Sequence, residues 1–300
     1  MDVKKIMVFT LSAIQSKYEV SRVKEEAKRM GIEVKHYLYN EMGFEFGCQG
    51  GKVFLGDEEV NFEQICGVWF RVAGTKSGKY ISARNTLIEI CKSKGVFCAN
   101  SQSYLKWERM DKILQHGVFG LSGIPVVETR VFYKKEDVLK YNFEYPVICK
   151  HGFGFQGKSV VKLNNRKELE SFIYSMEEKN LGLYLWQKFL AVGWDLRVVV
   201  VGGKAIGGMK RSAVGSEFRS NFSLGGKVEK WNLSSEEIFL AEKTAKVCGL
   251  DYGGVDIMKD RQGNNYILEI NRACQYKGFE KATGINVAKR VVEMLVRDCK

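Results

Sequence analysis

The first hundred residues alternate between short apolar runs and segments in which apolar positions recur at helical spacing. Continuous apolar runs are typical of strands buried on both faces of a parallel sheet. The predicted strands are residues 4–10, 32–38, 65–70 and 96–98, and the predicted helices are residues 18–30 and 80–94. Gly31 suits the end of the first helix. This order predicts a small parallel α/β domain that ends near Asn100.

From Met110 onward the pattern changes, and hairpins become evident. The predicted helices are residues 110–121, 135–141, 165–179, 234–248 and 284–298. The predicted strands are residues 126–132, 145–150, 159–163, 183–189, 195–201, 205–211, 253–258 and 265–271. Gly202 and Gly203 form a two-residue connection that suits a tight primed turn between antiparallel strands. The chain has only two prolines and no low-complexity stretch, so no disordered linker is evident.

Residues 152–159, GFGFQGKS, match two phosphate-binding patterns at once, GxxxxGK[ST] and GxGxxG. Both patterns require a helix directly after the loop, because its N-terminus receives the phosphate. Here residues 159–163 are typical of a strand, and the next helix starts only near Asn165. We therefore predict a hairpin loop that covers phosphates with its backbone amides, with Gln156 and Gly157 as candidate nucleotide contacts. A true P-loop and an ordinary glycine turn are the alternatives.

Two lysines near this loop are candidates for phosphate binding. Lys150 ends the apolar strand at the base of the loop, and Lys112 lies upstream in a predicted helix. The alternative for both is a solvated lysine, which is the usual state of this residue. The position of Lys150, at the end of an apolar strand and at the base of the loop, favours a role in phosphate binding.

The last predicted hairpin carries acids inside apolar strands. Asp256 lies within GGVDIM and Glu269 within LEIN. Such a carboxylate is costly to bury unless a cation or hydrogen-bond donor compensates it. Pairing the strands around the turn at 261–264 places Asp256 opposite Glu269, with Asn271 on the same face. Two carboxylates and an amide oxygen suit Mg²⁺. The alternative is a solvated face, since a one-residue slip of register separates the set.

Composition narrows the class of protein. No run approaches the roughly 18 apolar residues of a membrane helix, and residues 1–10 carry no cleavage signal. The eight cysteines form no CxxC pair and have no histidine at metal spacing; they are Cys48, Cys66, Cys91, Cys98, Cys149, Cys248, Cys274 and Cys299. We therefore expect reduced, mostly buried thiols, no zinc site and a cytoplasmic location.

The formal net charge of +12 favours anionic partners. Nucleic acid is one candidate, but no arginine-rich run or reader motif is present. A nucleotide together with an acidic co-substrate accounts for the charge equally well, and so does a solvated basic surface.

The ordered motifs resemble the RimK-like α-L-glutamate ligases of the ATP-grasp superfamily. The resemblance covers residues 105–295 through Asp111-Lys112, YPVICK, the segment 187–190, DLRVVVVGGKAIGGMKRSA, EFRSNFSLGG, GGVDIM, LEIN and GFEKATGINVA. It implies an α/β protein with the ATP-grasp fold, of the α+β sandwich type, preceded by a Rossmann-like domain. The implied divisions are an N-terminal domain at 1–100, a central lid subdomain at 101–185, and a C-terminal subdomain with the magnesium site at 186–300.

The resemblance also implies ATP and Mg²⁺ (or Mn²⁺) as cofactors. The residues matched to nucleotide contacts are Lys112 and Lys150 at the phosphates, the hinge Gln187, Lys188, Phe189 and Leu190 at adenine, Asp195 near the ribose, and Arg219, Ser220 and Asn221 at the phosphates. Arg211 matches a basic residue beside the reacting carboxylate. The metal ligands of the family coincide with Asp256, Glu269 and Asn271.

Two segments depart from the family pattern. The hinge has Lys188 where glutamate is usual, so we expect altered ribose or base contacts. After Asn271 the family commonly has Ser-Pro-Gly, whereas this chain has residues 272–276, RACQY. That loop borders the substrate region in such enzymes, so the acceptor is a point of expected difference.

The implied reaction is a two-step ligation through an acyl phosphate, with Arg211, Arg219 and Asn221 as catalytic residues. The expected partners are ATP, an amino acid, and a small-molecule or peptide acceptor, with no membrane and no nucleic acid, and the family often forms homo-oligomers. One alternative is an enzyme that forms side-chain esters or amides within a precursor peptide. Another is a nucleotide-binding or nucleic-acid-binding protein without catalysis.

Overall fold

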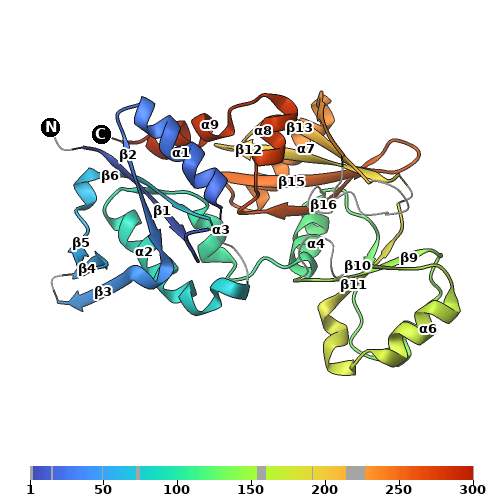
Figure 1. Cartoon of the computed structure of the whole chain (residues 1–300). Coiled ribbons are helices and arrows are strands. Elements are labelled where there is room, and N and C mark those ends of the chain that lie inside the picture. Colours follow the sequence, from blue (N-terminus) through green and yellow to red (C-terminus); the bar gives the residue numbers. More distant parts are fainter. Residues whose placement is uncertain are drawn as a thin grey trace.

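The computed structural model describes residues 3–14, 16–48, 50–71, 75–153, 160–190, 192–213 and 227–299 (Figure 1). Its first unit is a parallel sheet with strand order β2-β1-β6-β7. The strands are β1 (Lys5–Thr10), β2 (Glu33–Leu38), β6 (Ile65–Phe70) and β7 (Phe97–Cys98), and the helices in this region are α1 (Lys17–Arg29), α2 (Ile81–Ser93) and α3 (Ser101–Lys106). The predicted parallel α/β arrangement is confirmed.

Several short elements were not predicted from the sequence. They are β3 (Met42–Gly47), β4 (Gly50–Leu55) and β5 (Glu58–Glu59), which form an antiparallel sheet, together with α3, β14 (Lys227–Trp231) and α8 (Lys277–Thr283). These segments are short or rich in glycine and charge, so their periodicity is weak. Short 3₁₀ segments lie at Tyr39–Glu41, Phe62–Gln64, Thr75–Tyr80 and Glu178–Leu183.

The middle of the chain forms an antiparallel sheet with strand order β10-β9-β11-β8. Its strands are β8 (Thr129–Arg130), β9 (Val147–His151), β10 (Val160–Leu163) and β11 (Tyr184–Lys188), and the helices of this segment are α4 (Lys112–Leu121), α5 (Lys135–Lys140) and α6 (Arg166–Ser175). The strand predicted at 126–132 is reduced to β8. Pro125, just before it, accepts a hydrogen bond from the amide of Ile267 at 2.8 Å, so this stretch adjoins another strand instead.

The third sheet is antiparallel, with strand order β14-β13-β12-β15-β16. Its remaining strands are β12 (Trp194–Val201), β13 (Lys204–Ser212), β15 (Tyr252–Lys259) and β16 (Asn265–Asn271), and α7 (Ser235–Val247) and α9 (Val287–Val296) accompany it. The turn between β12 and β13 has positive φ at both Gly202 (+61°) and Gly203 (+77°), which confirms the predicted primed turn.

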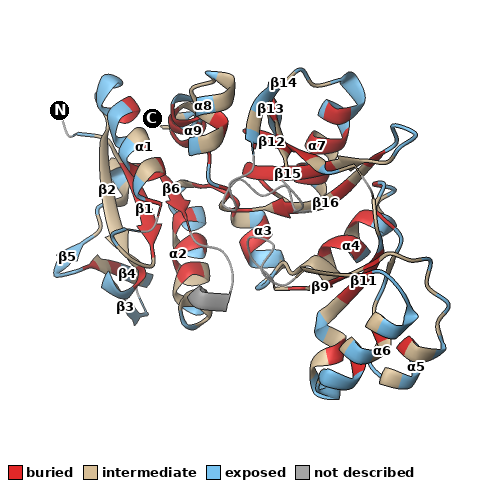
Figure 2. Ribbon diagram, turned by 45° about the vertical axis from the view of Figure 1, so that its right-hand side comes forward, coloured by how far each residue is buried: buried red, intermediate tan, exposed pale blue. Residues whose placement is uncertain are grey.

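The two faces of β12 pack into different cores, and this determines where its charged residues lie. Leu196, Val198 and Val200 enter one core together with α7, whereas Val199 and Val201 enter another core with residues of α1 and α9. Figure 2 shows buried positions in β1 and β6 of the first sheet, in β15 of the third, and on helices such as α2, α4 and α9. Asp195 and Arg197 continue the face of Val199 by alternation, so they lie where that core ends.

Helix α9 returns to the N-terminal sheet. It packs against α1 and β6, and residues from the two ends of the chain share one core. The proposed divisions at residues 100 and 185 remain a prediction. Among the described segments, no helix has the length and apolar character needed to span a membrane.

The expectation of reduced thiols is wrong for one pair of cysteines. Cys66 at the start of β6 and Cys299 near the C-terminus form a disulfide, with Cα atoms 4.8 Å apart. No local pattern indicates this pair, because 233 positions separate the two residues. The other six cysteines are free, and all of them except Cys48 are buried.

Candidate active site

The β15–β16 hairpin brings the two predicted acids together. Asp256 lies opposite Glu269, and Gly254 lies opposite Asn271, as predicted. The register is not continuous to the turn, however, because Ile257 pairs with Ile267 and a bulge intervenes. The assumption of an even register was therefore wrong near the turn, although the predicted acid pair is confirmed.

Helix α4 contacts the bulge and covers the outer edge of β16. The Nε2 atom of His116 lies 3.1 Å from the carbonyl oxygen of Leu268, the residue left over by the register shift. The amide of Ile270 donates to Oε1 of Gln115 at 2.8 Å. These bonds satisfy an edge that would otherwise be exposed, so α4 fixes the strand that carries Glu269.

Asp256 is surrounded by two arginines. Arg197 lies opposite it on β12 and donates to its carboxylate through Nε and also through Nη2, the latter at 2.8 Å. Arg211 on β13 places Nη2 2.9 Å from Oδ2 of Asp256. It also bonds Asp195 through Nε at 2.6 Å and Nη2 at 2.9 Å. Burial disfavours the charge of Arg211, but Asp195 and Asp256 outweigh it and raise the pKa of Arg211 above its usual range.

Glu269 has its own partners. Nζ of Lys112 lies 2.9 Å from its Oε2, and Nδ2 of Asn271 donates to its Oε1 at 2.9 Å. Burial opposes ionisation, but the Lys112 charge and the Asn271 hydrogen bond prevail and hold the pKa of Glu269 well below its ordinary value. The acid is therefore a carboxylate at neutral pH.

Lys112 also connects this hairpin to the glycine loop. Asp111 caps α4 by accepting a hydrogen bond from the amide of Leu114 at 2.9 Å. The amide of Lys112 donates to the carbonyl of Gly152 at 3.2 Å. The start of α4 therefore lies at the base of the loop, next to Glu269.

Lys150 is buried on β9, with 7% of its surface exposed, opposite Val160 of β10 and Leu185 of β11. Burial first, and the Lys112 charge second, lower the pKa of Lys150 to about 8, against the opposing effect of Glu269 and Asp256. Within the described part of the chain, its ammonium group forms no hydrogen bond or ion pair. An anion is the partner that such a buried cation requires.

The pairing of β9 with β10 tests the P-loop alternative for the glycine loop. Lys150 pairs with Val160 in an antiparallel register, and a strand rather than a helix follows the loop. Helix α6 begins only at Arg166, so the P-loop alternative is excluded. The candidates Gln156, Gly157, Arg219, Ser220 and Asn221 lie outside the described residues.

The four predicted hinge residues, 187–190, differ in burial and in their contacts. The side chain of Gln187 is buried and donates to Oγ1 of Thr129 at 2.6 Å, beside His116. Lys188 is exposed and forms an ion pair with Glu144 at 2.7 Å, which raises the pKa of Lys188. Phe189 lies under Nζ of Lys162, 4.3 Å from its ring centre, and Leu190 is half-buried after the strand. The side chain of Gln187 is therefore committed to an internal contact.

The acids fit a divalent cation with oxygen ligands. Among the described residues, no group of three His, Cys, Asp or Glu could hold a metal, so a site of that kind is not present there. The predicted set instead combines two opposed carboxylates with an amide. Nδ2 of Asn271 donates to Glu269, so the amide oxygen of Asn271 is not used in that hydrogen bond. This donor set suits Mg²⁺ or Mn²⁺.

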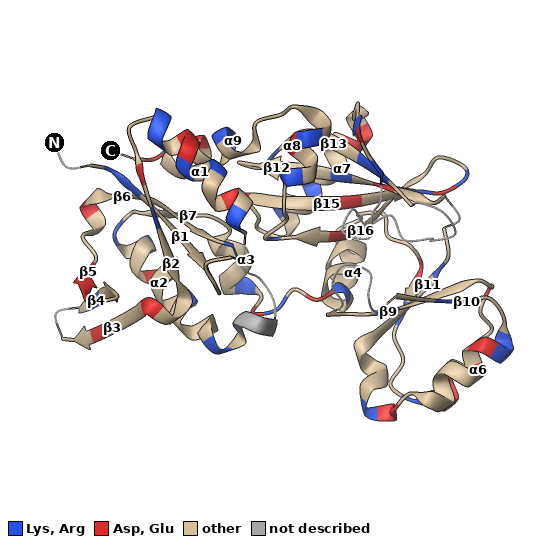
Figure 3. Ribbon diagram, viewed as in Figure 1, with Lys and Arg blue, Asp and Glu red and all other residues tan. Residues whose placement is uncertain are grey.

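Sequence reasoning missed Arg197, Gln115 and His116. Alternation in β12 could have indicated Arg197, since it lies two residues after Asp195 and shares its face. No local signal could have placed Gln115 or His116 against β16. Figure 3 shows acidic and basic positions interspersed along the ribbon, as in α1 and α6, which gives no support to a nucleic-acid-binding stripe.

Comparisons with known proteins identify the family of the chain. A RimK-like ATP-grasp domain model matches residues 106–295. The chain is 34% identical over 298 residues, 97% of this chain and 95% of the relative, to the probable alpha-L-glutamate ligase 2 of Pseudoalteromonas atlantica. The chain belongs to the RimK-like ATP-grasp family, and we assign it to the ligases that form carbon–nitrogen bonds.

Solved structures support the fold. The ATP-grasp ligase PsnB, in complex with a phosphomimetic variant of its minimal precursor, Mg and ADP, matches with a TM-score of 0.76 and 21% identity over 100% of both chains. A RiPP-associated ATP-grasp ligase of Chryseobacterium gregarium, in complex with ADP and a leader and core peptide, matches with a TM-score of 0.74 and 18% identity, over 99% of this chain and 98% of that chain. The predicted ATP-grasp fold is confirmed.

Proposed function

We propose that the chain uses ATP to activate a carboxylate as an acyl phosphate and then joins it to an amine. The observation that supports this most is the opposed pair Asp256 and Glu269, held on one hairpin beside Lys112 and Lys150. Two carboxylates facing each other among cations are suited to a bound metal and an anionic nucleotide.

In the first step, an oxygen of the substrate carboxylate attacks the γ-phosphorus, and the bond to the bridging oxygen breaks to release ADP. Asp256, Glu269 and Asn271 would hold Mg²⁺, which when bound offsets the negative charge of the phosphates. Lys150, enclosed at the base of the glycine loop, would bind a phosphate oxygen as an ammonium. Lys112 would exchange its bond to Glu269 for a phosphate contact, with Arg219 and Ser220 assisting, and Gln156 and Gly157 covering the phosphates.

In the second step, the amine nitrogen attacks the acyl carbon, the carbon–oxygen bond to phosphate breaks, and the amine loses a proton. Arg211 is rigidly aimed, because Asp195 and Asp256 both bind its guanidinium. It would stabilise the negative oxygen that forms on the acyl carbon, together with Asn221. Asp195 would also border the ribose, and the backbone of Gln187 to Leu190 would meet adenine.

The identity of a relative suggests the amino acid. Since the chain is 34% identical over nearly its full length to a probable alpha-L-glutamate ligase, we propose glutamate as the amino acid that is added, in the cytoplasm, to an amine or peptide acceptor. Peptide modification is the second candidate, because loop 272–276 departs from the family pattern and the solved ligases bind precursor peptides.

The test is Mg²⁺-dependent ADP release by the purified chain, measured across amino acids and acidic peptides, with mass spectrometry of the products. Addition of glutamate to an acceptor supports the first candidate, and loss of water within a peptide supports the second. Steep salt-dependent binding to DNA or RNA without ATP turnover would overturn both.

A further inference from the structure

Arg71 is an unusual arginine in the interface between the N-terminal sheet and the C-terminal loop. It directly follows β6, at the carboxyl edge of the parallel sheet, and its amide donates to the carbonyl of Phe9 at 2.9 Å. Only 2% of its surface is exposed. In open parallel sheets, ligands bind at this carboxyl edge.

The guanidinium of Arg71 forms no direct ion pair among the described residues, although burial is outweighed by neighbours that include Tyr252 and the carboxylate of Glu19, which raise the pKa of Arg71. Its Nη2 donates to the carbonyl of Cys274 at 3.1 Å, and its central carbon lies 4.4 Å from the ring centre of Trp69 and 5.6 Å from that of Tyr252. The buried Nε and Nη1 have no hydrogen-bond partner among the described residues. Buried donors without acceptors are costly, so a ligand that accepts hydrogen bonds from Nε and Nη1 would be favoured here, and a carboxylate offers two such oxygens.

Other buried arginines of the described chain differ in this respect. Arg197 and Arg211 bind carboxylates, Arg272 donates to the carbonyls of Ser103 and Trp107, and Arg84 donates to Asn85. Burial alone therefore does not leave guanidinium groups unpaired in this protein.

Arg71 lies close to the proposed reaction centre. A Cβ atom built on Gly254 would lie 2.8 Å from Cδ of Arg197 and 2.8 Å from Cβ of Cys274. Cys274 therefore packs beside the arginine that binds Asp256, while its carbonyl accepts from Arg71. Cys274 therefore lies between the guanidinium of Arg71 and the ion pair of Arg197 with Asp256.

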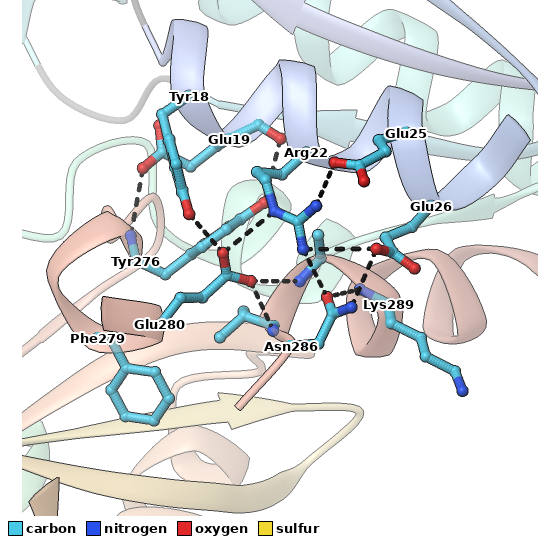
Figure 4. Close-up of polar contacts among 12 residues, drawn as sticks. Tyr18, Glu19, Arg22, Glu25, Glu26, Tyr276, Phe279, Glu280, Asn286 and Lys289 are labelled. Carbon is cyan, nitrogen blue, oxygen red and sulfur yellow. Dashed lines mark hydrogen bonds and ion pairs between the residues drawn. The ribbon is translucent and has the colours of Figure 1, made fainter. Parts of the chain in front are cut away.

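The loop that positions this carbonyl is fixed at both ends. Asn100 donates to the carbonyl of Arg272 at 3.2 Å. At the other end, the amide of Tyr276 donates to Glu19 at 3.2 Å and its hydroxyl donates to the carbonyl of Glu19 at 3.1 Å (Figure 4). The surrounding contacts of Glu280 with Tyr18 and Arg22 tie α8 to α1 as well. The segment in which this chain departs from its family is thus rigidly docked next to Arg71.

We propose that Arg71 binds a carboxylate of the acidic substrate that is not activated, so that the enzyme selects a dicarboxylic amino acid. This inference rests on the proposed function. In the proposed function, Lys112 and Lys150 bind the phosphates and Arg211 lies at the reacting carboxylate. Arg71 has no role there, and we assign it to the second carboxylate of the substrate. The unpaired Nε and Nη1 atoms are both buried, so the neighbouring side chains shift when the carboxylate binds.

The test compares L-glutamate with L-glutamine, which has the same shape but lacks the second carboxylate. In Arg71→Met, the KM for glutamate in ADP release should rise by about 10- to 100-fold, the range expected for a hydrogen bond to a charged group. The KM for glutamine and for ATP should stay unchanged, so the preference for glutamate collapses. Arg71→Lys keeps the charge and should restore part of the preference. The control Arg84→Met removes another buried arginine of the same domain and should retain the wild-type preference.

A second readout needs no turnover. L-glutamate, at ionic strength matched with KCl, should raise the Tm of the wild-type chain and leave that of Arg71→Met unchanged. If the wild type releases ADP but Arg71→Met keeps its preference, the inference is overturned and the proposed function stands. If the wild type releases no ADP with any carboxylate, the proposed function fails, and the glutamate-dependent Tm shift still decides on Arg71. A wild-type chain that neither uses nor is stabilised by L-glutamate overturns the inference.

Discussion

Asp256 and Glu269 face each other across β15 and β16, and each is held by cations from a different part of the chain. Asp256 is bound by Arg197 and Arg211 of the same sheet, whereas Glu269 is bound by Lys112 from the start of α4. Like charges so placed repel unless cations intervene. The pair therefore joins the sheet to α4 and provides the proposed metal ligands at the same point.

Loss of either acid should abolish the reaction. We expect Asp256→Asn and Glu269→Ala to lower Mg²⁺-dependent ADP release by about 100-fold or more, because the charge on the transferred phosphate is no longer offset. Asp260→Asn, in the exposed turn of the same hairpin, is the matched control and should keep wild-type release. Wild-type turnover by both acid variants would show that the metal assignment is wrong.

Lys150 should give the reaction a dependence on pH. Its pKa is lowered to about 8, so the ammonium that binds phosphate is lost as the pH rises through that value. We expect kcat/KM for ATP to fall above about pH 8, and the fall to shift to higher pH in Lys150→Arg. Unfolding free energy should instead rise from pH 8 towards 10.5, since there the unfolded chain binds the additional proton. A flat kcat/KM profile between pH 7 and 9 would contradict the assignment.

His116 should limit stability in mild acid. Burial first, and the Lys150 charge second, lower its pKa to about 3, so the folded chain keeps the ring neutral where the unfolded chain protonates it. Unfolding free energy should therefore decrease as the pH falls below about 6.5, by at most about 1.4 kcal/mol per pH unit for this one proton. Denaturant unfolding between pH 5 and 7 should show a shallower slope in His116→Gln. His151 also has a lowered pKa, but its ring is less buried, so His151→Gln should change the slope less than His116→Gln does. Equal slopes in all three proteins would refute this role.

Gly254 should tolerate no side chain. A Cβ atom would lie 2.8 Å from both Arg197 and Cys274, so Gly254→Ala should cost about 1–3 kcal/mol of unfolding free energy and displace Arg197 from Asp256. Gly117 lies at an exposed position in the middle of α4, where a Cβ atom would meet no other atom within 4 Å. Gly117→Ala should therefore stabilise the chain by about 0.5–1 kcal/mol. Thermal unfolding and ADP release of the two variants measure the contrast, and an unaffected Gly254→Ala would refute the packing argument.

The sequence by itself determined the features that depend on local pattern. Apolar runs and helical spacing predicted the long strands and helices, two glycines predicted the primed turn, and acids within apolar strands identified the hairpin of Asp256 and Glu269. Each of these signals arises from residues within a few positions of one another, where burial and backbone preference act directly.

Only the tertiary structure decided the contacts made by distant segments. Helix α4 contacts the bulge at Leu268 and supplies Lys112 to Glu269. Arg197 meets Asp256 from a neighbouring strand, and Cys66 joins Cys299. The same holds for Arg71, whose unpaired donors become evident only when loop 272–276 and the N-terminal sheet are packed together. Periodicity reveals which face of an element is buried, but not which other element covers it, because that choice depends on the packing of the whole chain.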